Sequence, residues 1–196
     1  MEKLHYIKDE MLAHVPMCTH ADPKNILIIG GCENLKGEVL KHKGIDKVVV
    51  ITDNIADQMA QLEENFFDVA IVAIEGFEVD RLFWGLLNKA LNVKGVVSAM
   101  ASTMLTQENV FEAQLKTLGE LFKIVMPYHY EALAHDGHLV CKNLLLASKF
   151  YHPTADINLQ RADLTEGMAY YNSDIAIGTF QVPTVSKKRF AGLIKF

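Results

Sequence analysis

The chain has 196 residues, of which 50% are hydrophobic, and a formal net charge of −5 at pH 7. This length suits one substantial domain, the acidic balance makes nucleic acid an unfavourable partner because phosphate binding requires a basic surface, and no apolar run is long enough to cross a membrane. The three cysteines lack metal-type spacing and the N-terminus lacks a signal-peptide core, so a reducing, cytoplasmic location is expected.

The predicted elements alternate between helix and strand along most of the chain. The first 22 residues are partly helical, with breaks expected at Pro16 and Pro23. After them we predict, in order, a strand at 26–31, a helix at 35–42, a strand at 47–51, a helix at 55–65, a strand at 68–74, a helix at 79–91, a strand at 95–100 and a helix at 109–122. Nearly continuous apolar strands that alternate with helices are typical of a parallel sheet covered on both faces.

The remaining segments complete the predicted fold. Strands at 123–126 and 139–148 have no clear helix between them, which predicts an antiparallel hairpin at one edge of the sheet. Residues 150–196 are polar and irregular. The helix at 109–122 is expected to turn five side chains inward, namely Val110, Leu115, Leu118, Leu121 and Phe122. The predicted class is α/β, with residues 1–196 forming a single Rossmann-like domain.

A glycine pair ends the first strand. Gly30 and Gly31 follow an apolar run and precede a helix, which is the opening of a nucleotide-type βαβ unit, where a ligand can sit over the strand end and the helix N-terminus. Glycine lets a backbone approach a ligand closely, but a tight strand-to-helix turn without a ligand gives the same pattern. Cys32, Glu33 and Asn34 stand where such a loop normally carries more glycine, which indicates a site that has been rebuilt or lost.

Several segments, read in chain order, resemble the polyamine aminopropyltransferases, the spermidine synthase family. They are Glu10-Met-Leu-Ala-His14 with Thr19-His20 and Pro23-Lys24, Ile26-Leu-Ile-Ile-Gly-Gly31 with Glu38-Val-Leu-Lys-His42, Phe67-Asp-Val-Ala-Ile-Val72, Leu146-Ala-Ser-Lys149, and Tyr170-Tyr-Asn-Ser-Asp-Ile175 followed by Phe180 and Val182-Pro183. The matches keep their order over nearly the whole chain. The fold of that family is the methyltransferase-type Rossmann sheet, which agrees with the alternation of strands and helices.

The resemblance implies transfer of an aminopropyl group from decarboxylated S-adenosylmethionine, as co-substrate, to a diamine such as putrescine. It implies no tightly bound cofactor, polyamine and nucleoside ligands of low molecular mass, no membrane partner, and compatibility with a homo-oligomer. One alternative is a catalytically degenerate paralogue that acts as a ligand-binding or protein-interaction module. A plain S-adenosylmethionine-dependent methyltransferase is disfavoured by the Tyr170-Tyr-Asn signature.

The departures from the family pattern concern the ligand site. The family's N-terminal β-stranded domain is expected to be absent, and its loop Gly-Gly-Gly-Asp-Gly-Gly is reduced to the sequence from Gly30 to Asn34. The acid that holds the ribose in the family is replaced by Ile51, which leaves Asp53 two residues further on. Only one helix fits between Asp53 and the strand that follows it, so the third strand and the adenine-binding turn of the family should be missing and the sheet should have about six strands.

Glu75 is the predicted catalytic residue. The catalytic Asp-Ser-Ser-Asp-Pro of the family becomes Ala73-Ile74-Glu75-Gly76 here, so Glu75 is the acid at the corresponding strand end. The acceptor amine is protonated at neutral pH, and a carboxylate must therefore take up a proton and balance the flanking ammonium groups. The alternative is a helix-capping or solvated loop acid ahead of the helix at 79–91.

The other predicted site residues each have a structural alternative. Gly30, Gly31, Glu33 and Asp53 are the predicted nucleoside-binding residues, although capping of the helix at 55–65 is the favoured role of Asp53. Tyr128 and Tyr130 lie where the family places an aromatic residue over the polyamine, and edge-strand packing would explain them equally well. Packing is favoured over ligand contact for Tyr170 and Tyr171. No metal site is predicted, because His129, His135 and His138 near Asp136 read as a turn between strands.

Overall fold

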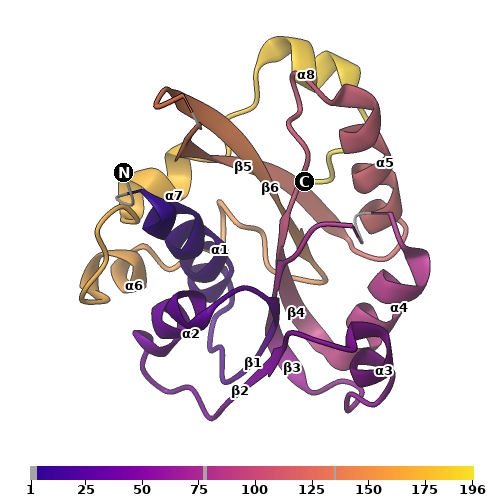
Figure 1. Cartoon of the computed structure of the whole chain (residues 1–196), viewed down its shortest axis with the longest axis vertical. Helices are drawn as coiled ribbons and strands as arrows, with labels where there is room; N and C mark the ends of the chain where they lie inside the picture. Colours follow the sequence, from indigo (N-terminus) through magenta and orange to yellow (C-terminus); the bar gives the residue numbers. More distant parts are fainter. Residues whose placement is uncertain (1–3, 77–78, 135) are drawn as a thin grey trace.

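The computed structural model describes residues 4–76, 79–134 and 136–196. Its centre is a six-stranded mixed sheet with the strand order β2-β1-β3-β4-β6-β5 (Figure 1). The strands are β1 (Asn25–Gly30), β2 (Lys47–Ile51), β3 (Phe67–Ala73), β4 (Leu91–Met100), β5 (Ile124–Leu133) and β6 (Leu139–Ser148). The first four run parallel, and β6 is antiparallel to both β4 and β5. The predicted α/β class and the edge hairpin are confirmed.

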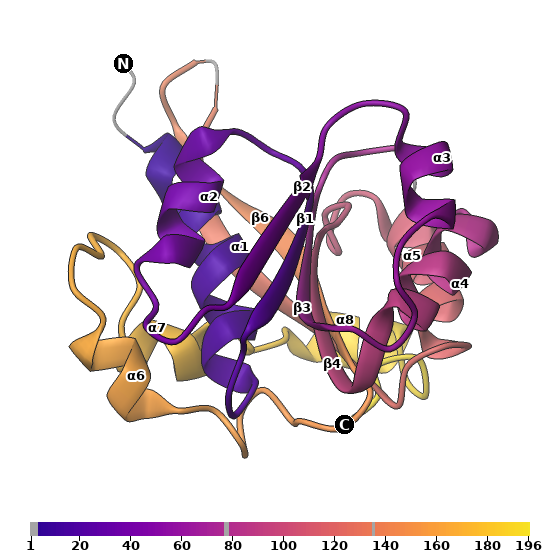
Figure 2. The ribbon, with the colours of Figure 1, turned by 90° about the horizontal axis from the view of Figure 1, so that it is seen from below.

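Helices cover both faces of the sheet, as the apolar strands require (Figure 2). One face carries α1 (His5–Thr19), α2 (Glu33–Leu40), α6 (Leu159–Leu164) and α7 (Ser173–Gly178). The other carries α3 (Ile55–Ala60), α4 (Arg81–Ala90) and α5 (Glu108–Gly119), and α8 (Thr184–Arg189) lies beside α5. None of the helices in the described part of the chain has the length and apolarity that a membrane span requires.

A single helix, α3, connects β2 to β3, as predicted. It ends at Ala60, five residues earlier than expected. In the turn that follows, Asn65 has a left-handed backbone with φ of 57°, and its N–H donates to the Lys89 carbonyl 2.8 Å away. The chain then enters β3 directly. No strand lies outside β2 in the described residues, so β2 is an edge of the sheet.

The predicted break at Pro16 is wrong, because Pro16 lies inside α1. An interior proline costs a helix about 3 kcal/mol. Burial outweighs this cost: α1 is inaccessible to solvent along almost its entire second half, including Met11, Leu12 and Met17. Tertiary packing therefore overrides the local helix-breaking signal, and α1 continues to Thr19.

Two predictions for the second half of the chain are also corrected. Val110 and Leu121 are 49% and 37% exposed, because the face of α5 that meets the core is set by Phe111, Leu115 and Leu118 at helical spacing. Residues 150–196 are not irregular throughout. They form α6, α7 and α8 and bury three aromatic side chains in the core, namely Tyr171, Phe180 and Phe190.

The buried carboxylate of Glu10 holds the C-terminal segment against α1. Its two oxygens accept hydrogen bonds of 2.8 Å from the backbone N–H groups of Ala169, Tyr170 and Tyr171. Three convergent donors satisfy a side-chain acceptor that is 1% exposed. This contact joins residues about 160 positions apart in the sequence.

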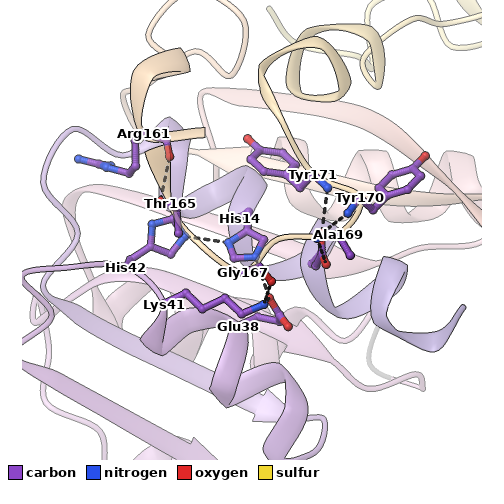
Figure 3. Close-up of polar contacts among 11 residues, drawn as sticks. His14, Glu38, Lys41, His42, Arg161, Thr165, Gly167, Ala169, Tyr170 and Tyr171 are labelled. Atoms are coloured by element: carbon purple, nitrogen blue, oxygen red, sulfur yellow. Dashed lines mark hydrogen bonds and ion pairs between the residues drawn. The ribbon is translucent and has the colours of Figure 1, made fainter. Parts of the chain in front are cut away.

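A second polar cluster joins α1 to the end of α2 (Figure 3). Nδ1 of His14 lies 2.8 Å from Nε2 of His42, and Nε2 of His14 lies 2.9 Å from Glu38. Burial alone would raise the pKa of Glu38, but hydrogen bonds from His14 and Lys41 outweigh it and lower the pKa. Glu38 is therefore ionised and accepts a hydrogen bond from Nε2 of His14. Burial, with the charges of His14 and Arg161, lowers the pKa of His42 to about 3, and His42 is therefore neutral.

Candidate functional site

The site is built at the edge of the sheet where the parallel strands end. A cavity of about 510 Å³ lies there, between the first turn of α1, the end of β4 and the β5–β6 hairpin. Its wall includes Glu75, Tyr130, Met100, Lys8 and Lys142. The structure thus brings the predicted catalytic residue and one of the two predicted substrate-binding tyrosines to the same cavity.

Glu75 follows β3 in an exposed loop. It does not cap α4, because the N-cap is Asp80, whose Oδ1 accepts hydrogen bonds from the N–H groups of Leu82 and Phe83 at 2.9 and 3.1 Å. The capping alternative for Glu75 is therefore wrong. What remains is an acid at the cavity wall, either solvated or in contact with a ligand.

Tyr130 gives the cavity a hydrogen-bond donor. Burial, together with the charges of Glu75 and Asp9, raises the pKa of Tyr130 to about 12, so its hydroxyl stays protonated at neutral pH. The influence of Glu75 on this pKa places its carboxylate within electrostatic reach of the phenol. The phenol oxygen and a carboxylate in one cavity can both accept hydrogen bonds from an ammonium group.

Tyr128 lies elsewhere. It is fully buried and donates its hydroxyl proton to the Met11 carbonyl at 3.2 Å, so the 2.5 Å contact with Ser98 is a hydrogen bond that Ser98 donates. It does not line the cavity. Of the two predicted substrate-binding tyrosines, the structure therefore gives Tyr128 a packing role and leaves Tyr130 for ligand contact. Tyr171 is also buried, and its ring centroid lies 5.5 Å from that of His14.

The glycine pair packs against the protein itself. Gly30 and Gly31 have left-handed φ angles of 75° and 81°. A Cβ on Gly30 would lie 2.0 Å from Cγ2 of Ile74, and one on Gly31 would lie 2.7 Å from Cδ2 of Leu35. The space beside the turn is thus filled by Ile74 and Leu35, which favours the tight-turn interpretation. Ligand contact through these glycines stays a prediction.

Substituting Gly30 with Ala should strongly destabilise the fold. The methyl group adds an overlap with Ile74 to the backbone strain, and we expect a loss of about 3 kcal/mol in the free energy of unfolding. Gly44→Ala is the matched control, because Gly44 has a φ of 82° but nothing within 4 Å of its added Cβ. Urea unfolding of both variants separates the two costs, and equal losses would contradict the packing role of Gly30.

Glu33 and Asp53 lie at the same sheet edge but outside the Glu75 cavity. Glu33 is the exposed first residue of α2, and its carboxylate lies 4.0 Å from Lys36. Asp53 does not cap α3: the N-cap is Asn54, whose side chain makes no cap hydrogen bond, and Oδ1 of Asp53 accepts from Nε2 of Gln58 at 2.8 Å. Ile51, which stands at the ribose-binding position of the family, is buried in the core.

Comparison with known proteins finds similarity to spermidine synthases and polyamine aminopropyltransferases. The sequence model of the spermine/spermidine synthase domain matches residues 5–68. The polyamine aminopropyltransferase of Thermotoga petrophila is 26% identical over 95% of this chain and 75% of its own length, and the spermidine synthase of Coffea arabica is 27% identical over 91% and 70%. The crystal structure of spermidine synthase from Thermotoga maritima matches with a TM-score of 0.84 at 25% identity, covering 97% of this chain and 75% of that one. The chain is therefore similar in sequence and fold to the spermidine synthases.

In this relative of the spermidine synthases, sequence reasoning missed part of the cavity wall. Lys8 comes from α1, while Lys142 comes from β6, and no local motif marks either. They meet only because α1 packs across the sheet onto β5. Within the described residues, no group of three histidine, cysteine or acidic side chains could hold a metal ion. His135 lies outside those residues, so the histidine segment is covered only in part.

Proposed function

We propose that this protein is an aminopropyltransferase of polyamine biosynthesis, which uses decarboxylated S-adenosylmethionine and a diamine such as putrescine. The observation that carries the proposal is the position of Glu75, on a cavity that it shares with Tyr130, in a chain of the spermidine synthase family. Its relatives are named polyamine aminopropyltransferase and spermidine synthase.

Glu75 would serve as the general base. It takes a proton from one ammonium group of the diamine, and the freed amine attacks the carbon of the aminopropyl chain that is bonded to sulfur. A C–N bond forms, the C–S bond breaks, and its electron pair returns to sulfur, which neutralises the sulfonium and releases methylthioadenosine. Tyr130 would orient the nitrogen by accepting a hydrogen bond from its N–H at the neutral phenol oxygen.

The rim of the cavity limits how strongly a diamine can bind. Lys8 and Lys142 carry the same charge sign as the substrate. Nζ of Lys8 lies 3.7 Å from Oδ1 of Asp9, which offsets its charge in part. We therefore expect a modest affinity for the acceptor, with binding that weakens for acceptors of higher positive charge.

Methylthioadenosine should bind weakly, with a dissociation constant of roughly 0.1 mM or higher. The contacts that hold adenine and ribose in the family lack counterparts here: Ile51 is buried in the core, and a single helix replaces the segment with the adenine turn. Titration calorimetry measures this directly. Micromolar binding would show that other residues of the chain supply the missing contacts.

The activity is tested by incubating the protein with decarboxylated S-adenosylmethionine and putrescine. Mass spectrometry should detect spermidine and methylthioadenosine in equal amounts. An absence of product with all common diamines would overturn the proposal and leave the degenerate paralogue as the better description. We place the protein in the cytoplasm, since its three cysteines are free thiols, as in a reducing compartment.

A further inference from the structure

The wall of the Glu75 cavity carries more basic than acidic side chains. Lys8 and His5 reach it from the first turn of α1, and Lys142 reaches it from β6. Among the described residues that line the cavity, Glu75 is the one acid. A substrate with positive charges alone therefore meets one carboxylate that attracts it and two lysine ammonium groups that repel it.

The strand register places Lys142 beside Tyr130. The two residues lie directly opposite each other in the antiparallel β5–β6 pair, so their side chains leave the same face of the hairpin. Burial raises the pKa of Tyr130 and the charge of Glu75 adds to this, which puts Glu75 within electrostatic reach of the same phenol. Tyr130 thus has a carboxylate on one side and a lysine side chain as its cross-strand neighbour, in one cavity.

The two lysines are available to a ligand. In the part of the chain that the structure describes, the ammonium group of Lys142 has neither an ion-pair nor a hydrogen-bond partner. Nζ of Lys8 lies 3.7 Å from Oδ1 of Asp9, but burial raises the pKa of Asp9, so this acid holds its negative charge less readily than an exposed one. Two ammonium groups from different walls can each donate to one oxygen of a carboxylate.

We propose that the substrate held in this cavity carries a carboxylate in addition to its amine. The amine lies at Glu75 and Tyr130. The carboxylate lies at Lys142, and Lys8 donates to it from the other wall. A ligand of this kind complements both signs of charge around the cavity, whereas putrescine complements Glu75 alone.

This inference rests on the proposed function and narrows its substrates to amino acids and their derivatives. The carboxylate can belong to the acceptor, as in ornithine, or to the donor, as in S-adenosylmethionine, which keeps the carboxylate that the decarboxylated donor lacks. The bond changes are the same in both cases. The amine that gave its proton to Glu75 forms a C–N bond, the C–S bond breaks, and its electron pair returns to sulfur with release of methylthioadenosine.

Matched pairs of ligands test the carboxylate. Ornithine differs from putrescine only by its carboxylate, and S-adenosylmethionine differs from its decarboxylated form in the same way. Titration calorimetry on the full chain should give a dissociation constant about tenfold lower for the carboxylated member of at least one pair. The pair that shows this preference tells whether the acceptor or the donor carries the carboxylate. Product formation with the four donor and acceptor combinations should follow the same preference.

Lys142→Glu tests the residue that holds the carboxylate. It reverses the charge at an exposed strand position, so the fold should persist, which circular dichroism checks. The carboxylated ligand should bind about tenfold more weakly than to the wild type, and its uncarboxylated counterpart should bind more tightly. Lys123→Glu is the matched control, because Lys123 is an exposed lysine directly ahead of β5 that does not line the cavity. It should keep the wild-type preference.

The binding experiment separates this inference from the proposed function, since it does not require turnover. Equal affinities within both ligand pairs, or a preference that survives Lys142→Glu, would overturn the inference. An inactive protein that still prefers the carboxylated ligand would overturn the proposed function alone. Transfer from decarboxylated S-adenosylmethionine to putrescine, without a preference in either pair, would overturn the inference alone.

Discussion

Glu75→Gln is expected to lower the rate of aminopropyl transfer by about a hundred- to ten-thousand-fold, the usual cost of losing a general base. Glutamine keeps the size and shape of the side chain, but its amide cannot take up a proton or balance an ammonium charge. The rate of methylthioadenosine release with putrescine as acceptor is the measurement. The melting temperature should change little, because Glu75 is exposed and does not cap α4.

The control for this experiment is Glu63→Gln. Glu63 is an exposed acid after α3 and does not line the Glu75 cavity, so its neutralisation changes the net charge equally without touching the site. Wild-type activity that survives Glu75→Gln would move the base to another acid, with Glu33 the next to test because it lies at the same edge of the sheet.

The strands of the central sheet could be predicted because each contains an apolar run that is visible in the local sequence. The predicted bounds of the strand at 47–51 agree with β2, since an apolar run between turn residues has no competing interpretation. α1 was harder, because Pro16 is a strong local breaker and only the burial of the surrounding helix overrules it. The helices after residue 150 have only six residues each, too few for periodicity to show, and they depend on tertiary contacts.

A site residue directly after a strand could be predicted from the sequence. Site residues that distant segments bring together could not. Glu75 lines the cavity because it follows the carboxyl end of a parallel strand, and its catalytic role stays a prediction. The sequence could not show whether Gly30 contacts a ligand or only makes a tight turn. The position of Ile74, which follows β3, favours the tight turn. Lys8 and Lys142 come together only in three dimensions.

Glu10→Gln is expected to destabilise the protein by about 3 kcal/mol, because a buried acceptor that serves several donors is replaced by a neutral group with a single oxygen. The amide N–H₂ of glutamine would face at least one backbone N–H of the segment at residues 169–171, leaving donors without an acceptor in a buried place. For a chain of this size the melting temperature should fall by about 6 to 12 °C. Calorimetry measures the shift, with Glu166→Gln, an exposed acid of the same C-terminal region, as the control.

The same variant has a local effect that a general loss of stability would not produce. Hydrogen exchange of the amides of Ala169, Tyr170 and Tyr171 should accelerate more than exchange in the central strands, because these three donors lose their common acceptor directly. A drop below about 1 kcal/mol, with the protection of these amides retained, would mean that packing of Tyr171 holds the segment on its own. The carboxylate matters beyond its own contacts, because α1 both binds this segment through Glu10 and carries Lys8 to the cavity wall. Loosening the anchor should therefore disturb the cavity wall at Lys8.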